Sequence, residues 1–375
     1  MIFSFELQKM NILHINWSLK YGGIETMLVN IANSQAKQGE TVSIVIINNY
    51  IESALLQRID KNIDIYQIGR VLGSHSPTFY FRLNTIINTI GPDVIHIHDS
   101  RIYCLLHGKK NRDKTVLTLH ALPYGTIKPS NPLLRFFPLL SLSIPGNVAF
   151  IDRIRKIASI SKSVRKELLE QYNVNSHVIE NGILVSKFRE KQDNGIVSKP
   201  LKVIQVGRLD HIIKGQDLLI EAASSLRELI DVTIVGDGPS MPLLMDLIKE
   251  KACEGNVHLV GSWEQESICN NLCNYDLFVM ASRKEGFGLT VAEAMVAGLP
   301  VLVSSGQGPE EVICGEKYGW VFNNGDSSDL AKKICFIIES YQLVLEKARS
   351  AKKYAREMYD VSNTAKQYIE YYKES

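Results

Sequence analysis

The sequence predicts an α/β protein with two doubly wound domains that face each other across a cleft. Its length of 375 residues suits two domains of roughly 150 to 200 residues each. Hydrophobic residues make up 45% of the chain, which is enough for a core in both. Short apolar, β-rich runs alternate with amphipathic stretches from end to end, as is typical of parallel sheets covered by helices.

Each half of the chain contains enough strand candidates for one doubly wound sheet. They are apolar runs of four to seven residues bounded by turn residues. In the first half they are residues 10–16, 41–47, 63–68, 93–98, 115–120, 156–161 and 177–180. In the second half they are residues 201–207, 231–236, 256–261, 276–282, 300–305 and 319–322.

The domain boundary is expected in a polar segment near the middle of the chain. Residues 186–199 form the predicted linker, because they have no apolar period and contain a glycine. The first domain is therefore expected to span residues 1–185 and the second residues 200–359. A final helix over residues 360–375 is expected to return to the first domain.

The small net charge of +2 conceals an asymmetry between the two halves. Residues 1–200 contain 24 Lys and Arg against 15 Asp and Glu, and the rest of the chain contains 18 against 25. Residues 101–170 are the most basic, with 13 cationic and 4 anionic side chains. This bias favours a first domain that contacts an anionic membrane or a phosphate-bearing acceptor, although solvated helix faces would also produce it. No nucleic-acid partner is expected.

The location is expected to be cytoplasmic, with peripheral contact at the inner face of the membrane. The longest apolar stretch, residues 131–146, contains an arginine and three prolines and is shorter than the ~20 residues that span a bilayer. The N-terminus lacks the features of a signal peptide. Six scattered cysteines without a CxxC pair indicate reduced thiols.

Ligands of open parallel sheets bind at the carboxyl ends of the strands, so the chemistry is expected there. Neither half has the GxGxxG turn that a dinucleotide-binding dehydrogenase would show after its first strand. Instead, Gly22 and Gly23 open a helix, where free backbone amides could bind an anion. A plain helix start is an equal alternative.

The first strand of the second half is followed by two cations. Gly207 ends the strand, and Arg208 and Lys214 lie in the connection to the next helix. Two cations in one strand-end loop suit a diphosphate, since Arg offers a fork of donors and Lys a point charge. Solvated loop charges are the alternative. Gly236 and Val260 end the next two strands in turns that would let backbone groups reach a nucleobase, and plain turns are the alternative.

The segment "EGFGLTVAEAM" places Glu285 and Glu293 around the start of a predicted helix. The helix N-terminus is a seat for phosphate, which the two carboxylates would repel. We therefore expect them to accept hydrogen bonds from the two hydroxyl-bearing ends of a nucleotide sugar. The donor-binding residues expected in this segment are Gly286, Phe287, Gly288, Leu289 and Glu293.

The run "HIHD" ends another strand of the first half. His96 and His98 share a strand face and could ligate a metal. Polar contacts to an acceptor through His98 and Asp99, or histidines satisfied at a strand end, explain the run better, and no metal site is expected.

These motifs resemble the glycosyltransferase family 4 enzymes, which have the GT-B fold of two facing Rossmann-like domains. "EGFGLTVAEAM" is similar to their E-x7-E motif, and the other motifs occur in the order of that family. The resemblance implies that Arg208 and Lys214 hold the donor diphosphate, Glu293 the ribose, and Glu285 and His120 the transferred sugar. The sequence departs from the family at Leu184 and at residues 306–311.

The function expected from this resemblance is that of a retaining glycosyltransferase without a cofactor. It would move a hexose or N-acetylhexosamine from a nucleotide-diphosphate sugar, above all a UDP-sugar, to a hydroxyl of a glycan or lipid-linked glycan in bacterial surface polysaccharide synthesis. The chain has no Asp-x-Asp pair, so transfer is expected to be metal-independent. A GT-B nucleotide-sugar epimerase and a non-catalytic partner subunit that binds a nucleotide sugar are the alternatives.

Overall fold

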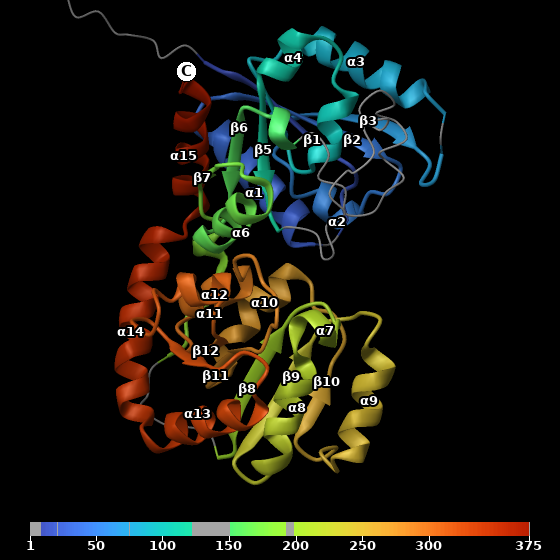
Figure 1. Cartoon of the computed structure of the whole chain (residues 1–375). Helices are drawn as coiled ribbons and strands as arrows, with labels where there is room; N and C mark the ends of the chain where they lie inside the picture. The colour runs from blue at the N-terminus through green and yellow to red at the C-terminus, as the bar shows by residue number, and fades with distance from the viewer. Residues whose placement is uncertain (1–8, 21, 75, 122–150, 193–198, 375) are drawn as a thin grey trace, which may run out of the picture. The chain divides into compact units, whose positions relative to one another are not determined.

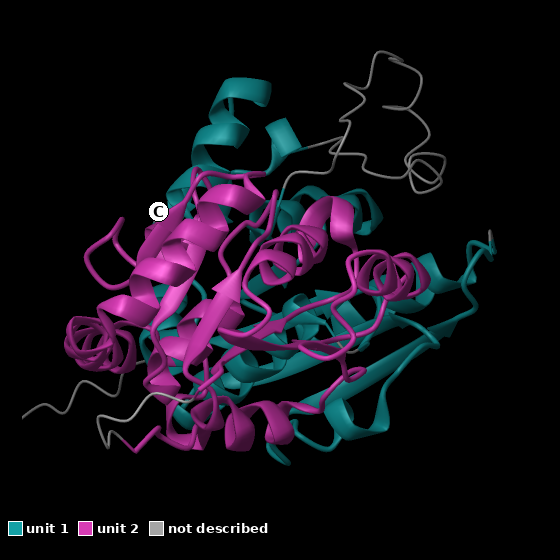
Figure 2. Ribbon diagram, turned by 90° about the horizontal axis from the view of Figure 1, so that it is seen from below, with its two compact units in different colours: residues 1–182, 361–375 teal, residues 183–360 magenta. Residues whose placement is uncertain are grey.

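The computed structural model describes residues 9–20, 22–74, 76–121, 151–192 and 199–374. These residues form two units, which Figure 2 shows in different colours. Unit 1 comprises residues 1–182 and 361–375, and unit 2 comprises residues 183–360. Each unit contains one parallel sheet covered by helices, so the predicted α/β class is confirmed (Figure 1).

Unit 1 is built on a sheet of seven strands in the order β3-β2-β1-β4-β5-β6-β7. The strands of this sheet are β1 (Asn11–Asn16), β2 (Thr41–Asn48), β3 (Asp64–Arg70), β4 (Val94–Ile97), β5 (Thr115–Leu119), β6 (Lys156–Ser159) and β7 (His177–Val178). The helices are α1 (Gly23–Lys37), α2 (Ser53–Leu56), α3 (Thr78–Ile90), η1 (Ser100–Leu105), α4 (Lys109–Asp113), η3 (Ile151–Arg153), α6 (Lys162–Tyr172) and α15 (Val361–Lys373).

Unit 2 is built on a sheet of six strands in the order β10-β9-β8-β11-β12-β13. The strands of this sheet are β8 (Leu201–Val206), β9 (Ile230–Val235), β10 (Val257–Leu259), β11 (Leu277–Met280), β12 (Val301–Ser304) and β13 (Trp320–Phe322). The helices are η4 (Val185–Lys187), α7 (His211–Lys214), α8 (Gln216–Ser225), α9 (Met241–Glu250), α10 (Gln265–Asn271), η5 (Leu272–Asn274), α11 (Leu289–Ala297), α12 (Gly308–Val312), α13 (Ser327–Glu339) and α14 (Tyr341–Met358).

Both sheets have a switch point in their strand order. β1 pairs with β4 as well as β2, and β8 pairs with β11 as well as β9. The connections from β1 and from β4 therefore leave in opposite directions, as do those from β8 and β11. Loops diverge above such a point and leave room for a ligand at the carboxyl ends of the strands.

The central strands are buried on both faces because helices cover both sides of a parallel sheet. All four residues of β4, β11 and β12 are buried. Local signals fix several helix ends: Ser161 Oγ caps α6 by accepting from the Val164 amide at 3.2 Å, and Gly91 ends α3 in the left-handed conformation. Burial of apolar runs and local capping residues thus account for the strands and helices on which the site is built.

The last helix, α15, belongs to unit 1, where it packs against α1 (Figure 1). The segment expected as a linker is attached to unit 2 over its first part. The Arg189 amide donates to Cys269 O at 3.0 Å and the Lys191 amide to Ala297 O at 2.7 Å. Within the described ranges, every helix is too short or too polar to cross a lipid bilayer. The apolar part of the predicted membrane contact, residues 133–144, lies outside the described residues.

Candidate active site

The expected phosphate-binding cations lie in the connection that follows β8. Arg208 has an exposed side chain, and Lys214 ends the short helix α7. Two buried glutamines hold the backbone of this connection: Gln216 Nε2 donates to Arg208 O at 2.8 Å, and Gln205 Nε2 donates to Lys214 O at 2.8 Å. The loop that presents both cations is therefore fixed from beneath by side chains of unit 2.

Lys214 and Glu285 form an ion pair. Lys214 Nζ lies 2.5 Å from Glu285 Oε2, and the side chains are 27% and 18% exposed. The two residues are 71 positions apart and come from the loops that follow the adjacent strands β8 and β11. The structure thus brings Lys214, predicted to bind the diphosphate, into direct contact with Glu285, predicted to bind the transferred sugar.

This ion pair depends on a close approach of two backbone segments. Gly215 has a φ of +63°, and a Cβ built there would lie 1.9 Å from Ala281 O. Only glycine fits this position, since a side chain would collide with backbone and the left-handed φ would be strained. The amides of Arg283 and Lys284 also donate to Ile213 O, at 2.8 and 3.2 Å. The loops after β8 and β11 are consequently locked together.

A third loop, after β12, supports Glu285 from the other side. The Glu285 amide donates to Gln307 Oε1 at 2.9 Å, and the Gly308 amide donates to Glu285 O at 3.1 Å. A Cβ on Gly308 would lie 2.2 Å from Gly286 O, so glycine is required here too. These contacts come from residues 306–311, where the sequence departs from the resembled family, and they hold the Glu285 backbone.

Helix α11 begins directly after this junction. Gly288 caps it with a φ of +91°, and a Cβ there would lie 2.9 Å from Pro309 Cγ. The Phe287 side chain is 2% exposed and packs edge-on against Tyr359, with ring centroids 5.7 Å apart. A donor could therefore contact Phe287 only through its backbone. Leu289, the first helical residue, is partly exposed.

Glu293 lies one turn into α11 and is 6% exposed. Its Oε1 accepts a hydrogen bond of 2.9 Å from Gln265 Nε2, at the start of α10. Gln265 was not among the residues predicted from sequence. This hydrogen bond helps to offset the cost of burying the Glu293 carboxylate.

The predicted base contacts lie at the ends of β9 and β10. A Cβ on Gly236 would lie 1.9 Å from Gly207 O, so these two glycines let the loops after β8 and β9 meet. Gly207 donates its amide to Val235 O at 2.9 Å. Val260 is 44% exposed and donates its amide to Ile234 O at 3.1 Å. The glycines thus have a packing role, and Val260 has an accessible side chain.

In unit 1, Gly22 caps α1, and Gly23 is its first residue. Asp99 caps η1 and accepts from Arg101, with Arg101 Nη2 2.5 Å from Asp99 Oδ2. The Arg101 guanidinium also lies over the Trp17 ring, 5.7 Å from its centroid. The carboxylate proposed to meet an acceptor is therefore already paired with a cation.

His98 and His120 lie at the ends of β4 and β5, with His98 Nδ1 3.3 Å from His120 Nε2. The other nitrogen of His98 lies 3.3 Å from His14 Nδ1, and His98 is 5% exposed. Burial lowers the pKa of His14 and of His120 to about 4. Burial, followed by the neighbouring imidazoles, lowers the pKa of His98 well below its usual value. His14, His98 and His120 thus form a hydrogen-bonded row. Of these three, His120 is partly exposed and is the one that a ligand could contact.

The residues His14, His96 and His98 are also the described cluster whose ligand atoms, all within 4.8 Å, could hold a metal. Hydrogen bonds already occupy the ring nitrogens. His96 Nε2 lies 2.7 Å from Thr118 Oγ1, and His96 Nδ1 lies 2.7 Å from Tyr372 OH. A metal at this cluster would have to break these hydrogen bonds. The donor set therefore fits a hydrogen-bonded network better than a metal site.

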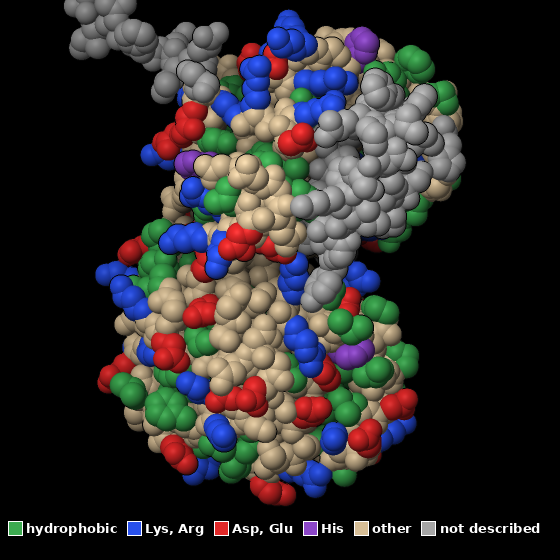
Figure 3. All heavy atoms as spheres, viewed as in Figure 1, with side chains coloured by type: hydrophobic (Ala, Val, Ile, Leu, Met, Phe, Trp, Pro, Cys, Tyr) green, Lys and Arg blue, Asp and Glu red, His purple; other side chains and the backbone are tan. Residues whose placement is uncertain are grey.

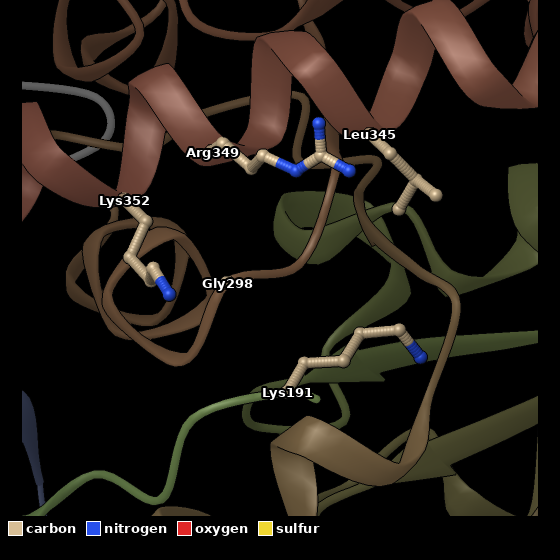
Figure 4. Close-up of a pocket in the computed structure, with 5 residues that line it drawn as sticks. All are labelled: Lys191, Gly298, Leu345, Arg349 and Lys352. Carbon is tan, nitrogen blue, oxygen red and sulfur yellow. The ribbon is translucent and has the colours of Figure 1, made fainter. Parts of the chain in front are cut away.

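Figure 4 shows a pocket at the other end of α11, beside its C-cap Gly298. Its cations are engaged: Lys191 Nζ lies 3.1 Å from Asp276 Oδ1, and Lys352 Nζ lies 2.9 Å from Glu190 Oε2. The C-terminus of a helix also repels anions. The residues that line the pocket are Lys191, Gly298, Leu345, Arg349 and Lys352.

Two parallel α/β sheets, each with its polar residues at the strand ends of a switch point, are the architecture of the GT-B glycosyltransferases. The family described as "Glycosyl transferases group 1" matches residues 186–358, and the one described as "Glycosyltransferase Family 4" matches residues 21–187. The two matches together span nearly the whole chain. The chain belongs to the group 1, family 4 glycosyltransferases and is an enzyme of that class.

Individual relatives agree with this assignment. The chain is 23% identical to the phosphatidylinositol N-acetylglucosaminyltransferase GPI3 subunit of Saccharomyces cerevisiae, over 94% of this chain and 79% of the relative. It is 24% identical to the N-acetyl-alpha-D-glucosaminyl L-malate synthase of Bacillus anthracis, over 74% and 73%. The crystal structure of Anabaena Alr3699/HepE in complex with UDP and glucose has the same fold. Its TM-score is 0.77 at 21% identity, covering 96% of this chain and 98% of that one.

Proposed function

We propose that this glycosyltransferase moves a hexosyl or N-acetylhexosaminyl group from a UDP-sugar to a hydroxyl of a glycan or lipid-linked glycan, with retention of anomeric configuration, in bacterial surface polysaccharide synthesis. The observation that carries the proposal is the Lys214–Glu285 pair of 2.5 Å beside the N-terminus of α11. One cation and one carboxylate are held there by three strand-end loops. This combination suits a ligand whose phosphate and hydroxyl groups are adjacent.

In the proposed reaction, the protein supplies the positive charge that the departing UDP requires. Negative charge accumulates on the diphosphate as the glycosidic bond breaks, and preorganised cations and dipoles stabilise it. Arg208, Lys214 and the amide end of α11 would provide two full charges and a helix dipole. We therefore propose that transfer requires no divalent metal.

Binding of the diphosphate would exchange the partners of the ion pair. Lys214 would turn from Glu285 to a phosphate oxygen, and Glu285 would then accept a hydrogen bond from a hydroxyl of the transferred sugar. Glu293, oriented by Gln265, would accept from the ribose hydroxyls. In unit 1, His120 would contact the same sugar, and Gly22 and Gly23 would contribute backbone amides.

The named relatives support the choice of donor. A structural neighbour was crystallised with UDP-glucose and with UDP and glucose. The yeast and Bacillus relatives are named for N-acetylglucosaminyl compounds. A UDP-linked glucose or N-acetylglucosamine is accordingly the first donor to try.

We further propose that unit 1 contacts an anionic membrane or a lipid-diphosphate acceptor. Lys109, Lys110 and Arg112 of α4 are exposed. Figure 3 shows Lys and Arg side chains gathered over this helix on the face in view. Such a patch attracts anionic surfaces over about 8 Å at physiological ionic strength.

A screen of nucleotide-sugar donors by thermal shift tests the proposal. A donor present at 100 times its dissociation constant should add about 2.7 kcal/mol of stability. UDP-glucose or UDP-N-acetylglucosamine should stabilise the protein more than the GDP- and CMP-sugars at the same concentration. Stabilisation by a GDP-sugar alone would refute the choice of UDP. Analysis of the products formed without acceptor would separate a transferase from an epimerase, and slow donor hydrolysis by the pure protein would exclude a non-catalytic partner subunit.

A further inference from the structure

The histidines that lead to His120 form a continuous hydrogen-bonded chain with a buried glutamine at its far end. Gln35, on α1, is fully buried and lies between His14 and Tyr372. Its Oε1 lies 2.8 Å from His14 Nε2, and its Nε2 donates to Tyr372 OH at 3.1 Å. An amide differs at its two ends, because the oxygen only accepts and the nitrogen only donates. Gln35 can therefore give the chain a direction.

The direction follows from the chemistry of a neutral imidazole, which carries one proton. Gln35 Oε1 can only accept, so His14 carries its proton on Nε2 and accepts at Nδ1. The proton between His14 and His98 must then come from His98 Nε2, at 3.3 Å. This leaves His98 Nδ1 as an acceptor, so the 3.3 Å contact with His120 is donated by His120 Nε2.

The nitrogen end of the Gln35 amide sets the direction of a second row of hydrogen bonds, which runs through Tyr372 of α15. Tyr372 OH accepts from Gln35 Nε2 and is buried, so its own proton must go to its other partner, His96 Nδ1, at 2.7 Å. His96 then carries its proton on Nε2 and donates to Thr118 Oγ1 at 2.7 Å. Every donor and acceptor along this branch is satisfied when the Gln35 amide is oriented this way. A rotated amide would reverse both branches.

We propose that Gln35 is a positioning residue that fixes His120 with its proton on Nε2 and a lone pair on Nδ1. Within the described part of the chain, His120 Nδ1 makes no hydrogen bond. It is thus the nitrogen left to accept a hydrogen bond from a hydroxyl of the donor sugar. The inference rests on the proposed function, since the contact between His120 and that sugar is part of it.

Replacing Gln35 by methionine should reverse the chain. His14 Nε2 would face an apolar side chain, and a buried N–H without an acceptor is less well tolerated than a buried lone pair. The His14 proton would move to Nδ1 and be donated to His98, which would in turn donate to His120. His120 would then present an N–H in place of a lone pair. The opposite tautomer should predominate by roughly tenfold, the ratio that corresponds to about 1.4 kcal/mol.

The tautomer can be measured without any substrate by long-range 1H–15N NMR of protein labelled at its nine histidines. The His120→Gln variant identifies the His120 signals. The wild type should show His120 protonated at Nε2, and Gln35→Met should show it protonated at Nδ1. Gln38→Met is the matched control, because Gln38 lies on the same α1 end and also bonds α15, through Ser362 O at 2.9 Å. It should leave the tautomer unchanged.

Kinetics then test the role of this tautomer. Gln35→Met should lower kcat roughly tenfold and leave the affinity for UDP unchanged, because Arg208, Lys214 and Glu293, the proposed side-chain ligands of UDP, all lie in unit 2. If Gln35→Met does not fold, Tyr372→Phe leaves Gln35 Nε2 without its acceptor, so the amide should rotate and His120 should carry its proton on Nδ1. The same His120 tautomer in the wild type and in the foldable variant would overturn the proposal. A changed tautomer with unchanged kcat would overturn the positioning role. The NMR result stands even if no transfer activity is found, so the two proposals fail separately.

Discussion

Replacing Glu285 by glutamine should make the protein bind UDP more tightly and transfer sugar more slowly. The substitution keeps the shape of the side chain and removes its charge. Glu285 Oε2 lies 2.5 Å from Lys214 Nζ, so a diphosphate that binds Lys214 must compete with the carboxylate for this cation. The variant removes that competitor and also the proposed acceptor for a hydroxyl of the transferred sugar.

The two effects differ in size and in sign. A hydrogen bond between charged groups contributes about 1.5 to 3 kcal/mol when it is buried. Lys214 and Glu285 are 27% and 18% exposed, so solvent screening reduces this contribution to about 1 kcal/mol. UDP should therefore bind roughly fivefold more tightly. Loss of a preorganised contact in the transition state should lower kcat on the order of 10²-fold.

Isothermal titration with UDP and initial-rate kinetics with the best donor measure both effects. Glu254→Gln is the matched control, since Glu254 is an exposed acid of unit 2, and it should change neither quantity. Glu293→Gln should instead weaken UDP binding about tenfold, because the ribose hydroxyls lose a charged acceptor. Equal losses of UDP affinity in the Glu285 and Glu293 variants would refute this division of roles.

Three further predictions concern the loops, the buried histidines and the basic surface. Gly215→Ala should destabilise unit 2 by at least ~1 kcal/mol and reduce turnover. Gly255→Ala is the control, because a Cβ there meets open space, and it should hardly change the thermal unfolding temperature. Equal unfolding temperatures for the two variants would contradict the close packing at Gly215. The pKa of His14 is lowered from 6.5 to about 4, so between these pH values the unfolded chain binds more protons than the folded protein. The free energy of unfolding should therefore fall as the pH falls through this window, by about 3 kcal/mol in total for this histidine. Denaturation in urea at pH 7, 6 and 5 should show the decline, and a free energy of unfolding that does not change with pH would contradict it. Lys109→Glu with Lys110→Glu should weaken sedimentation with anionic liposomes at low salt, and wild-type protein that stays in the supernatant under those conditions would remove the membrane proposal.

The fold could be predicted because its signals are local. Each strand of the two sheets coincides with a short apolar run that ends in turn residues. Arg208 and Lys214 could be predicted because they follow a strand candidate that ends at Gly207. The start of α11 could be predicted because Gly288 follows another strand candidate. Residues that directly follow the end of a strand could thus be predicted from the hydrophobic pattern and the spacing of the sequence.

The contacts inside the site could not be predicted, because they depend on side chains far apart in the chain. The Lys214–Glu285 pair exists because the Gly215 backbone passes close to Ala281, and no spacing rule encodes that approach. Gln307 supports Glu285 from a loop that looked only like a departure from the resembled family.

The histidine chain was hidden for the same reason. His14 lies in the predicted strand of residues 10–16 and Gln35 in the helix that Gly22 and Gly23 open, but neither was predicted to belong to the site. The only sequence signal for either was a single polar residue within an otherwise apolar pattern. The helix α15 that completes the network lies more than 300 residues away from them along the chain.

The most direct test of the central claim is to follow transfer by 1H NMR from an α-linked UDP-sugar to a glycan acceptor in the presence of EDTA. The claim is that charges of the protein, and no divalent metal, carry a retaining transfer. It predicts that the first product signal is the α-anomer, that EDTA leaves the rate nearly unchanged, and that Arg208→Ala lowers the rate on the order of 10²-fold. A β-linked first product would contradict retention. Loss of activity in EDTA that manganese or magnesium restores would contradict the proposed source of charge.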